Sequence, residues 1–212
     1  MKVEIYSDIS CPWCYIGEKR FSAALAEYPG APVDVVFRPY QLDPAAPATP
    51  RPLVEALREK FGPNVQSMVA RVTDAAGEEG ITMHWERAVA VNTLTAHRLL
   101  HLALRDYGAD VQRALAERLF DAHFTAGGDV GDVALLGELA AAVGMDRTRV
   151  IEYLASDEGV AETRAALDEA RDLGIRAVPT FIFDEKYIVE GGQPSAVFAE
   201  VLREVAKLAA QP

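Results

Sequence analysis

Residues 7–17 read "SDISCPWCYIG", and they hold both cysteines of the chain, Cys11 and Cys14. The preceding run "VEIYSDI" (3–9) is apolar and rich in β-favouring residues, which predicts a strand. After Cys14, "YIGEKRFSAALAEY" repeats apolar residues at intervals of three and four, which predicts a helix. The two thiols are therefore expected where a strand passes into a helix.

The next segment, "VDVVFRPY" (33–40), predicts a second strand, apolar enough to be buried on both faces as in a parallel sheet. Strand, helix and strand within forty residues form a βαβ unit. The run "LDPAAPATPRP" (42–52) then brings four prolines and no periodic apolar pattern. It indicates a connection, and we expect a domain boundary there.

The middle of the chain, from Leu53 to Ser156, predicts only helices, and 92–108 and 109–127 show the clearest apolar repeat. Two later helices are expected to begin after Asp132 and Asp146, whose side chains are of the type that caps helix starts.

The last part of the chain returns to mixed elements. A helix is expected over 161–174, and strands over 179–183 and 187–192, joined by the charged turn "DEK" that is typical of a hairpin. A final helix is expected from Pro194 to about Ala209.

This order predicts an α/β fold, βαβ followed by αββα, interrupted by an all-helical insertion. The expected division is a discontinuous domain of residues 1–48 and 157–212, with a helical subdomain over 49–156. Insertion of a subdomain at an exposed loop is well tolerated.

Charge and composition exclude several classes of function. The formal net charge of −11 repels phosphate backbones and anionic lipid, so neither nucleic acid nor membrane is expected as a partner. The start "MKVEIYSDIS" lacks the uncharged stretch of a secretory signal, so a cytoplasmic location is expected. In a reducing cytosol a lone close pair of cysteines indicates catalysis or metal binding rather than a structural disulfide.

The position of the cysteines favours redox chemistry. The first turn of a helix leaves backbone N–H groups without partners and carries a partial positive charge, so the upstream thiol of such a motif ionises more readily than free cysteine. Pro12 suits an early helical position because it lacks an N–H. Cys14 returns to the same face and can attack a mixed disulfide at Cys11. The spacing therefore predicts a nucleophile and a resolving thiol.

A metal site is the rival interpretation. Structural zinc takes four ligands, and the chain offers its cysteine pair with the histidines at 84, 97, 101 and 123. His97 and His101 are spaced for one helix face, but they belong to a different subdomain from the cysteines. We expect no metal, and we expect each histidine to be a surface residue or a hydrogen-bonded polar residue.

A proline opens the predicted strand in "AVPTFIF" (177–183). By itself it fits a trans proline at the start of an edge strand, because cis bonds are a minority before proline. Together with the upstream strand–CxxC–helix pattern, it predicts a cis Val178–Pro179 bond that presents backbone groups to the nucleophilic sulfur.

Several motifs, in order, resemble the thioredoxin superfamily, and within it the FrnE-like group of DsbA-family oxidoreductases. They are "SDISCPWCYIGEKRF", "FRPYQLDP", "NTLTAHRLLH", "LFDAHFTAGGDVGD" and "GIRAVPTFIFDEKYIVEGGQP", which together span essentially the whole chain. The resemblance implies a thioredoxin fold whose active site faces the helical insertion, with Cys11 as nucleophile, Cys14 as resolving thiol and Pro179 as the cis proline. The resemblance also implies that Asn92, Thr93 and His97 form a helical wall opposite the cysteines. From their positions beside the cysteines and the proline, Asp8, Pro12, Trp13 and Val178 are further candidate supporting residues.

The chain departs from the family pattern at two places. A buried carboxylate often precedes the first cysteine by six residues, and Ile5 stands there instead. Asp8 could act as base toward Cys14, or it could simply favour the helix start electrostatically; both remain open. Where strongly oxidising DsbA has histidine, Trp13 supplies no charge, so a potential between about −120 and −270 mV is expected. Trp13 could cover apolar surface or serve as a substrate platform.

The leading interpretation is an enzyme of thiol–disulfide exchange, acting on a thiol- or disulfide-containing protein or small molecule, with no bound cofactor and with glutathione as a possible co-substrate. Monomer and homodimer are both open. The related kappa-class glutathione transferases and 2-hydroxychromene-2-carboxylate isomerases are a second interpretation, although they generally have serine where Cys11 stands. A non-catalytic module that binds a metal or an apolar ligand is a third.

Overall fold

The computed structural model describes residues 1–210 and is built around a four-stranded mixed sheet in the order β2-β1-β5-β6. Strand β1 pairs in parallel with β2 and antiparallel with β5, and β6 completes an antiparallel hairpin with β5. The hairpin turns at Asp184 and Glu185, which both have positive φ. The strands are β1 Lys2–Ser7, β2 Asp34–Pro39, β5 Thr180–Phe183 and β6 Tyr187–Glu190. This arrangement confirms the predicted βαβ unit and C-terminal hairpin.

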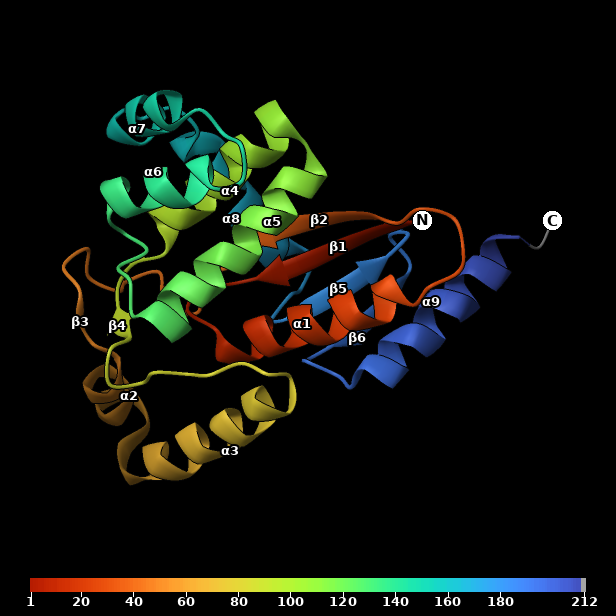
Figure 1. Cartoon of the computed structure of the whole chain (residues 1–212), viewed down its shortest axis with the longest axis horizontal. Coiled ribbons are helices and arrows are strands. Elements are labelled where there is room, and N and C mark those ends of the chain that lie inside the picture. The colour runs from red at the N-terminus through yellow and green to blue at the C-terminus, as the bar shows by residue number, and fades with distance from the viewer. Residues whose placement is uncertain (211–212) are drawn as a thin grey trace.

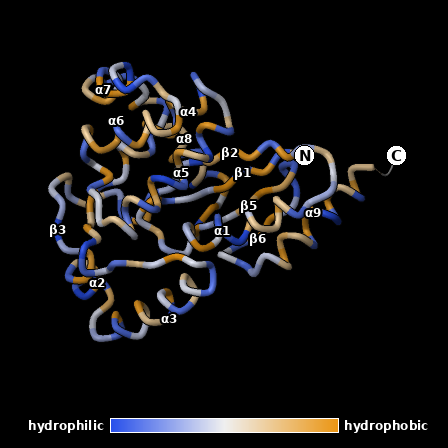
Figure 2. Tube along the Cα trace, viewed as in Figure 1, coloured by the Kyte–Doolittle hydropathy of each residue, from blue (hydrophilic) through white to orange (hydrophobic). Residues whose placement is uncertain are grey.

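Helices cover both faces of this sheet (Figure 1). Helices α1 (Pro12–Ala26) and α9 (Ser195–Ala209) lie side by side on one face, and α8 (Val160–Asp172) lies against the other. On the first face, Phe21 of α1 packs its ring 5.4 Å from that of Phe181 and 5.6 Å from that of Phe198. Hydrophobic colour gathers at β1, β2 and β5 in Figure 2. Burial of these aromatic rings fixes α1, and with it the cysteines, against the sheet.

The segment between β2 and α8 is mainly helical, but the prediction of helices alone is wrong at one place. Strands β3 (Arg51–Pro52) and β4 (Val89–Ala90) form a two-residue antiparallel pair, continued by Leu53 N–H donating to Ala88 O at 2.9 Å. The partners are far apart in sequence, so no local periodicity reveals them. The helical elements are α2 Leu53–Phe61, a 3-10 turn Gly62–Asn64, α3 Val65–Glu78, α4 Leu94–Tyr107, α5 Ala109–Phe120, the π-helix η2 Asp121–Ala126, α6 Val133–Ala141 and α7 Arg147–Ala155.

The two predicted N-caps are confirmed. The Asp132 carboxylate accepts hydrogen bonds from Ala134 N and Leu135 N at the start of α6, and Asp146 accepts one from Arg149 N at the start of α7. Each satisfies backbone donors that the first turn leaves free.

One glutamine joins the helices to the sheet. Strand β2 is an edge strand, and the Gln112 side chain from α5 accepts a hydrogen bond from Phe37 N at 2.9 Å and donates one to Phe37 O at 3.0 Å. It therefore pairs with the backbone at the open edge of β2 as a neighbouring strand would.

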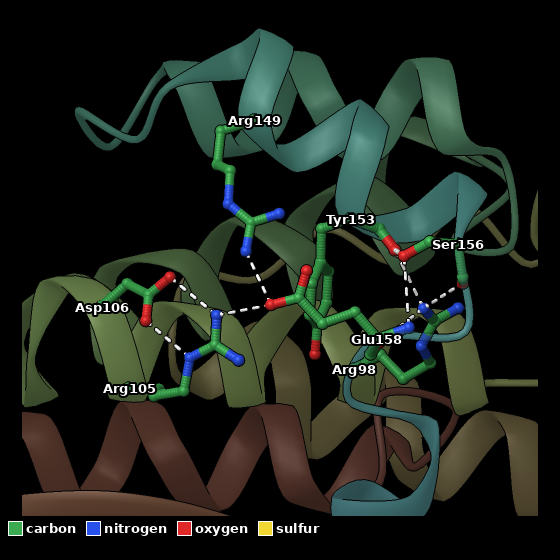
Figure 3. A network of polar contacts seen from close by, with 7 residues as sticks. All are labelled: Arg98, Arg105, Asp106, Arg149, Tyr153, Ser156 and Glu158. Carbon is green, nitrogen blue, oxygen red and sulfur yellow. Dashed lines mark hydrogen bonds and ion pairs between the residues drawn. The ribbon is translucent and has the colours of Figure 1, made fainter.

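A second junction joins α4 to the end of α7 (Figure 3). Arg98 of α4 is buried, and its guanidinium donates to the carbonyl oxygens of Tyr153, Leu154, Ser156 and Glu158 at 2.7–3.4 Å. An arginine beside the last carbonyl oxygens of a helix donates hydrogen bonds that these acceptors otherwise lack. Its positive charge also interacts favourably with the negative end of the helix dipole. This contact sets α7 and the start of α8 against α4.

The division into 1–48 with 157–212, and 49–156, stays a prediction. One cluster of buried apolar residues runs through both parts, from Val3 and Phe198 to Leu99 and Tyr153. Among the described residues, no helix is long and apolar enough to cross a membrane.

Candidate active site

The two cysteines lie where the sequence predicts, at the passage from β1 into α1. Cys11 is the N-cap residue of α1, with an extended backbone (φ −94°, ψ 111°), and Pro12 is the first helical residue. Cys14 lies in the first turn, 3.4 Å from Cys11, with no bond between them. The positive end of the α1 dipole therefore lies beside Cys11.

The segment opposite Cys11 contains Val178 and Pro179 and belongs to the C-terminal part of the chain. The Val178–Pro179 peptide bond is cis, which confirms the prediction, and Val178 O accepts a hydrogen bond from Cys11 Sγ at 3.6 Å. Helix α1 approaches this segment closely: a Cβ on Gly17 would lie 3.0 Å from Pro179 Cγ and 3.1 Å from Gly192 Cα. Glycine at 17 thus permits the contact that brings the two segments together.

Cys14 is held as a thiol. Its burial, and then the hydrogen bond and charge of Cys11 beside it, raise its pKa well above the ordinary value. The Ser7 hydroxyl and the Asp8 backbone N–H act in the opposite direction and favour the thiolate. Because burial dominates, Cys14 needs a base before it can attack a neighbouring sulfur.

Asp8 is a buried carboxylate with several partners. It accepts hydrogen bonds from Ser10 N, Ser10 Oγ and Leu42 N, and His97 Nε2 lies 3.4 Å from its Oδ1. Burial opposes its ionisation, but the 3.4 Å contact and charge of His97, with the Leu42 N–H and the Thr93 hydroxyl, hold the pKa of Asp8 below its usual value. Asp8 therefore stays charged, and it is its backbone N–H that reaches Cys14.

The three residues implied as a helical wall have different contacts. Thr93 and His97 are buried and face Asp8. Asn92 instead donates through Nδ2 to Pro44 O and Ala46 O, both at 3.1 Å, and so fastens the proline-rich connection. Sequence reasoning did not single out Gln41, whose Nε2 donates to Asn92 Oδ1 at 3.0 Å and approaches Thr93 Oγ1 at 3.4 Å.

His123, which the sequence offered only as one of four histidines, has an unexpected environment. It lies in the π-helix η2 and is fully buried, and neither ring nitrogen has a hydrogen-bond partner among residues 1–210. Burial lowers its pKa to about 4, although the charge of Asp8 acts in the opposite direction. The expectation of a surface or hydrogen-bonded histidine is wrong here. The π-helix turns this side chain inward, and no pattern in "LFDAHFTAGG" marked it.

The remaining candidates are placed as follows. Trp13 is half-buried and packs against the hydrophobic core. His84 is a partly exposed histidine that contacts Glu86, and burial lowers the pKa of the half-buried His101. Within the described part of the chain, no three His, Cys, Asp or Glu side chains are grouped so that they could hold a metal ion.

This fold and this pair of thiols define a thioredoxin-fold protein with a helical insertion. The family model of the DSBA-like thioredoxin domain matches residues 2–203, and the chain belongs to that family.

Known proteins similar to this chain include one curated sequence and several solved structures. YwbO of Bacillus subtilis (strain 168), an uncharacterized protein, is 27% identical over 209 residues, 97% of each chain. The crystal structure of the probable DsbA oxidoreductase SCO1869 from Streptomyces coelicolor is 34% identical with a TM-score of 0.87, covering 100% of this chain and 92% of that one.

Two more distant structures share the fold. A 2-hydroxychromene-2-carboxylate isomerase is 17% identical, with a TM-score of 0.70 over 99% of this chain and 98% of its own. The cytosolic disulfide reductase DsbM from Pseudomonas aeruginosa, solved with GSH, is 18% identical, with a TM-score of 0.67 over 97% and 100%.

Proposed function

We propose that this protein catalyses thiol–disulfide exchange through Cys11 and Cys14. The observation that carries the proposal is the placement of Cys11: it caps α1, lies 3.4 Å from a second thiol and contacts Val178 O beside the cis proline. Membership of the DsbA-like family and the likeness to oxidoreductases support it. Because the dithiol is itself the redox centre, the reaction requires no bound cofactor.

The reaction proceeds in two displacements. The Cys11 thiolate attacks one sulfur of a substrate disulfide, so that a mixed disulfide forms and the first substrate thiolate leaves. Cys14, after losing its proton, attacks the Cys11 sulfur, so that the Cys11–Cys14 disulfide forms and the second substrate thiolate leaves. The substrate gains two electrons and the cysteine pair loses them; the reverse sequence oxidises a substrate dithiol.

Glutathione disulfide is a suitable test substrate, because DsbM, a disulfide reductase of this fold, was solved with GSH. The reduced protein is mixed with glutathione disulfide, quenched in acid and weighed by mass spectrometry. We expect the Cys14→Ser variant to accumulate one glutathione per chain, the wild type to proceed to an internal disulfide, and Cys11→Ser to form neither product.

The same variants separate exchange from glutathione-dependent isomerisation. An isomerase of this architecture uses the thiol of bound glutathione and generally has serine where Cys11 stands. Cys11→Ser should therefore abolish exchange, whereas an isomerase or transferase activity would survive this substitution. A wild-type protein that forms no mixed disulfide but isomerises 2-hydroxychromene-2-carboxylate in the presence of glutathione would overturn the proposal.

A further inference from the structure

A small cavity lies beside the site, at the end of β1 and against the edge strand β2. Its volume is about 40 Å³, and helices α4, α5 and α8 close it. The lining residues that matter here are Ser7, Phe37, His97, His101, Gln112 and Thr163. One water needs at least about 10–15 Å³ of such space, so the cavity has room for one water or more.

Three buried polar atoms that belong to residues of this lining have no hydrogen-bond partner among residues 1–210. They are Ser7 Oγ, His97 Nε2 and Thr163 Oγ1, on residues that are 3%, 3% and 0% exposed. A buried polar group without a partner costs about 1–3 kcal/mol, and buried waters typically make about three hydrogen bonds to such groups. The lining is therefore suited to hold ordered water between Ser7 and His97.

Ser7 connects this cavity to the resolving thiol. It is the last residue of β1, and its buried hydroxyl, which has no formed hydrogen bond among residues 1–210, acts on Cys14 in the direction that favours the thiolate. Cys14 thus has a hydroxyl beside it that also borders the cavity.

Neither the usual relay position nor Glu4 offers Cys14 an unpaired carboxylate. Ile5 occupies the strand position where a relay carboxylate would stand, and it is buried in the apolar core. The neighbouring Glu4 is already paired, with Arg38 at 2.6 Å and with Lys2 at 3.1 Å. Of Cys11, Ser7 and Asp8, which all act on the Cys14 thiol, Ser7 lines the cavity.

We propose that the Ser7 hydroxyl, water in this cavity and the His97 imidazole carry the proton away from Cys14 when it resolves a mixed disulfide. The proton moves from Cys14 Sγ to Ser7 Oγ as the serine proton passes to water and a water proton passes to His97. Cys14 becomes the thiolate that attacks the Cys11 sulfur, and His97 becomes an imidazolium. This inference rests on the proposed exchange reaction and adds residues that act through Cys14 rather than on substrate.

The charges around His97 suit this step. Asp8 Oδ1 lies 3.4 Å from His97 Nε2, so the carboxylate stabilises the imidazolium that forms. At the rim, β2 contributes Arg38, which Glu4 neutralises, and α4 contributes His101, whose pKa burial and then Arg105 lower. Helices α5 and α8 contribute the uncharged Gln112 and Thr163. From η2, His123 interacts with Asp8.

The test compares the two displacement steps separately. Rapid acid quench after mixing with glutathione disulfide measures formation and decay of the mixed disulfide in Ser7→Ala and His97→Asn. His84→Asn is the matched control, because His84 lies away from the cavity lining. We expect Ser7→Ala and His97→Asn to resolve at least about tenfold more slowly at pH 7, consistent with loss of general base assistance. Formation of the mixed disulfide, measured in a Cys14→Ser background, should be unchanged.

Two readouts distinguish a relay from a structural role. The deficit should shrink at alkaline pH, where solvent hydroxide replaces the imidazole, and the variants should keep the wild-type circular dichroism. Ser7→Ala removes a single oxygen, so the test stands even if His97→Asn folds poorly. Wild-type resolution rates at pH 7 in Ser7→Ala, or a deficit in Ser7→Ala that does not change with pH, overturn the relay. If the wild type itself forms no mixed disulfide, the proposed function fails instead.

Discussion

Two buried polar clusters are attached to α4 through neighbouring residues, Arg98 and His97, and they differ in the nature of their partners. Arg98 donates to four backbone carbonyls around the end of α7, and Figure 3 draws three of these residues, Tyr153, Ser156 and Glu158. His97 faces the carboxylate of Asp8 and a cavity that also borders Ser7. The cluster around Arg98 pairs a guanidinium with backbone carbonyl groups. The cluster around His97 instead contains side chains that can gain or lose a proton.

This difference separates a structural cluster from a functional one. The partners of Arg98 are backbone carbonyl oxygens, which do not titrate, so these contacts do not depend on the protonation of a partner. Around His97, several polar atoms lack partners, and the pKa values of Asp8, Cys14 and His123 are shifted. Shifted titrating groups that converge beside a pair of thiols mark a candidate site of chemistry.

The Arg98 cluster gives the largest expected effect on stability. Arg98→Met should lower the free energy of unfolding by about 3 kcal/mol, because several buried carbonyl oxygens lose their donor. The rate at which Cys11 reacts with glutathione disulfide, per folded molecule, should not change. Urea unfolding and the quench assay measure the two quantities. Loss of reactivity with no loss of stability would reverse the roles of the two clusters.

His123 should make the protein sensitive to mild acid. Its pKa is about 4 in the folded state against an ordinary value of 6.5, so between these values the unfolded state binds a proton that the folded state does not. Stability should therefore fall as pH decreases through this window, by about 2 kcal/mol from pH 7 to pH 5.

The measurement for His123 is urea unfolding at a series of pH values in wild type and His123→Gln. The variant should lack this fall between pH 6.5 and 4. If the two curves run parallel through that window, His123 is not held neutral by burial.

Asp8 should give a smaller effect at a lower pH. Its pKa is lowered in the folded state, so its contribution is complete above the ordinary value of 3.8 and is lost as pH falls toward the folded-state pKa. Asp8→Asn should cost about 1–2 kcal/mol at pH 6, where hydrogen bonds to a charged acceptor are lost, and should flatten the stability curve below pH 4. Urea unfolding at a series of pH values measures this loss of stability. If Asp8→Asn is as stable as the wild type at pH 6, the charge of the carboxylate is not needed for stability.

Trp13, one of the two residues between the cysteines, should have the smallest effect, and that effect is on the reduction potential. Trp13 brings no charge to the start of α1, so we expect a reduction potential between about −270 and −120 mV, and Trp13→His should raise it by stabilising the reduced form. Equilibration with glutathione redox buffers measures both. A wild-type value at or above −120 mV would contradict this role of Trp13.

Local pattern predicted much of the molecule. The strand–CxxC–helix junction, the hairpin, the caps at Asp132 and Asp146 and the cis bond before Pro179 each depend on residues close in sequence or on a motif specific to one family. Backbone preferences, turn residues and apolar spacing are all readable over such short windows.

Contacts between distant residues were not readable in this way. Gln112 pairs with Phe37 across 75 positions, and the β3–β4 pair joins segments on either side of two helices. Asp8 could be placed at the helix start from sequence, but its partner His97 and the cavity behind it follow only from the way α4 packs against β2. The inward turn of His123 depends on the π-helix, for which the sequence carries no local signal.

The most direct measurement of the central claim is the alkylation rate of each cysteine. The reduced protein is treated with limiting iodoacetamide at pH 7, and peptide mass spectrometry assigns the label, with urea-unfolded protein as the reference for equal reactivity. Because Cys11 caps α1 while burial and Cys11 raise the pKa of Cys14, we predict rapid labelling of Cys11 and little labelling of Cys14. Equal, slow labelling of both thiols in the folded protein would contradict the account.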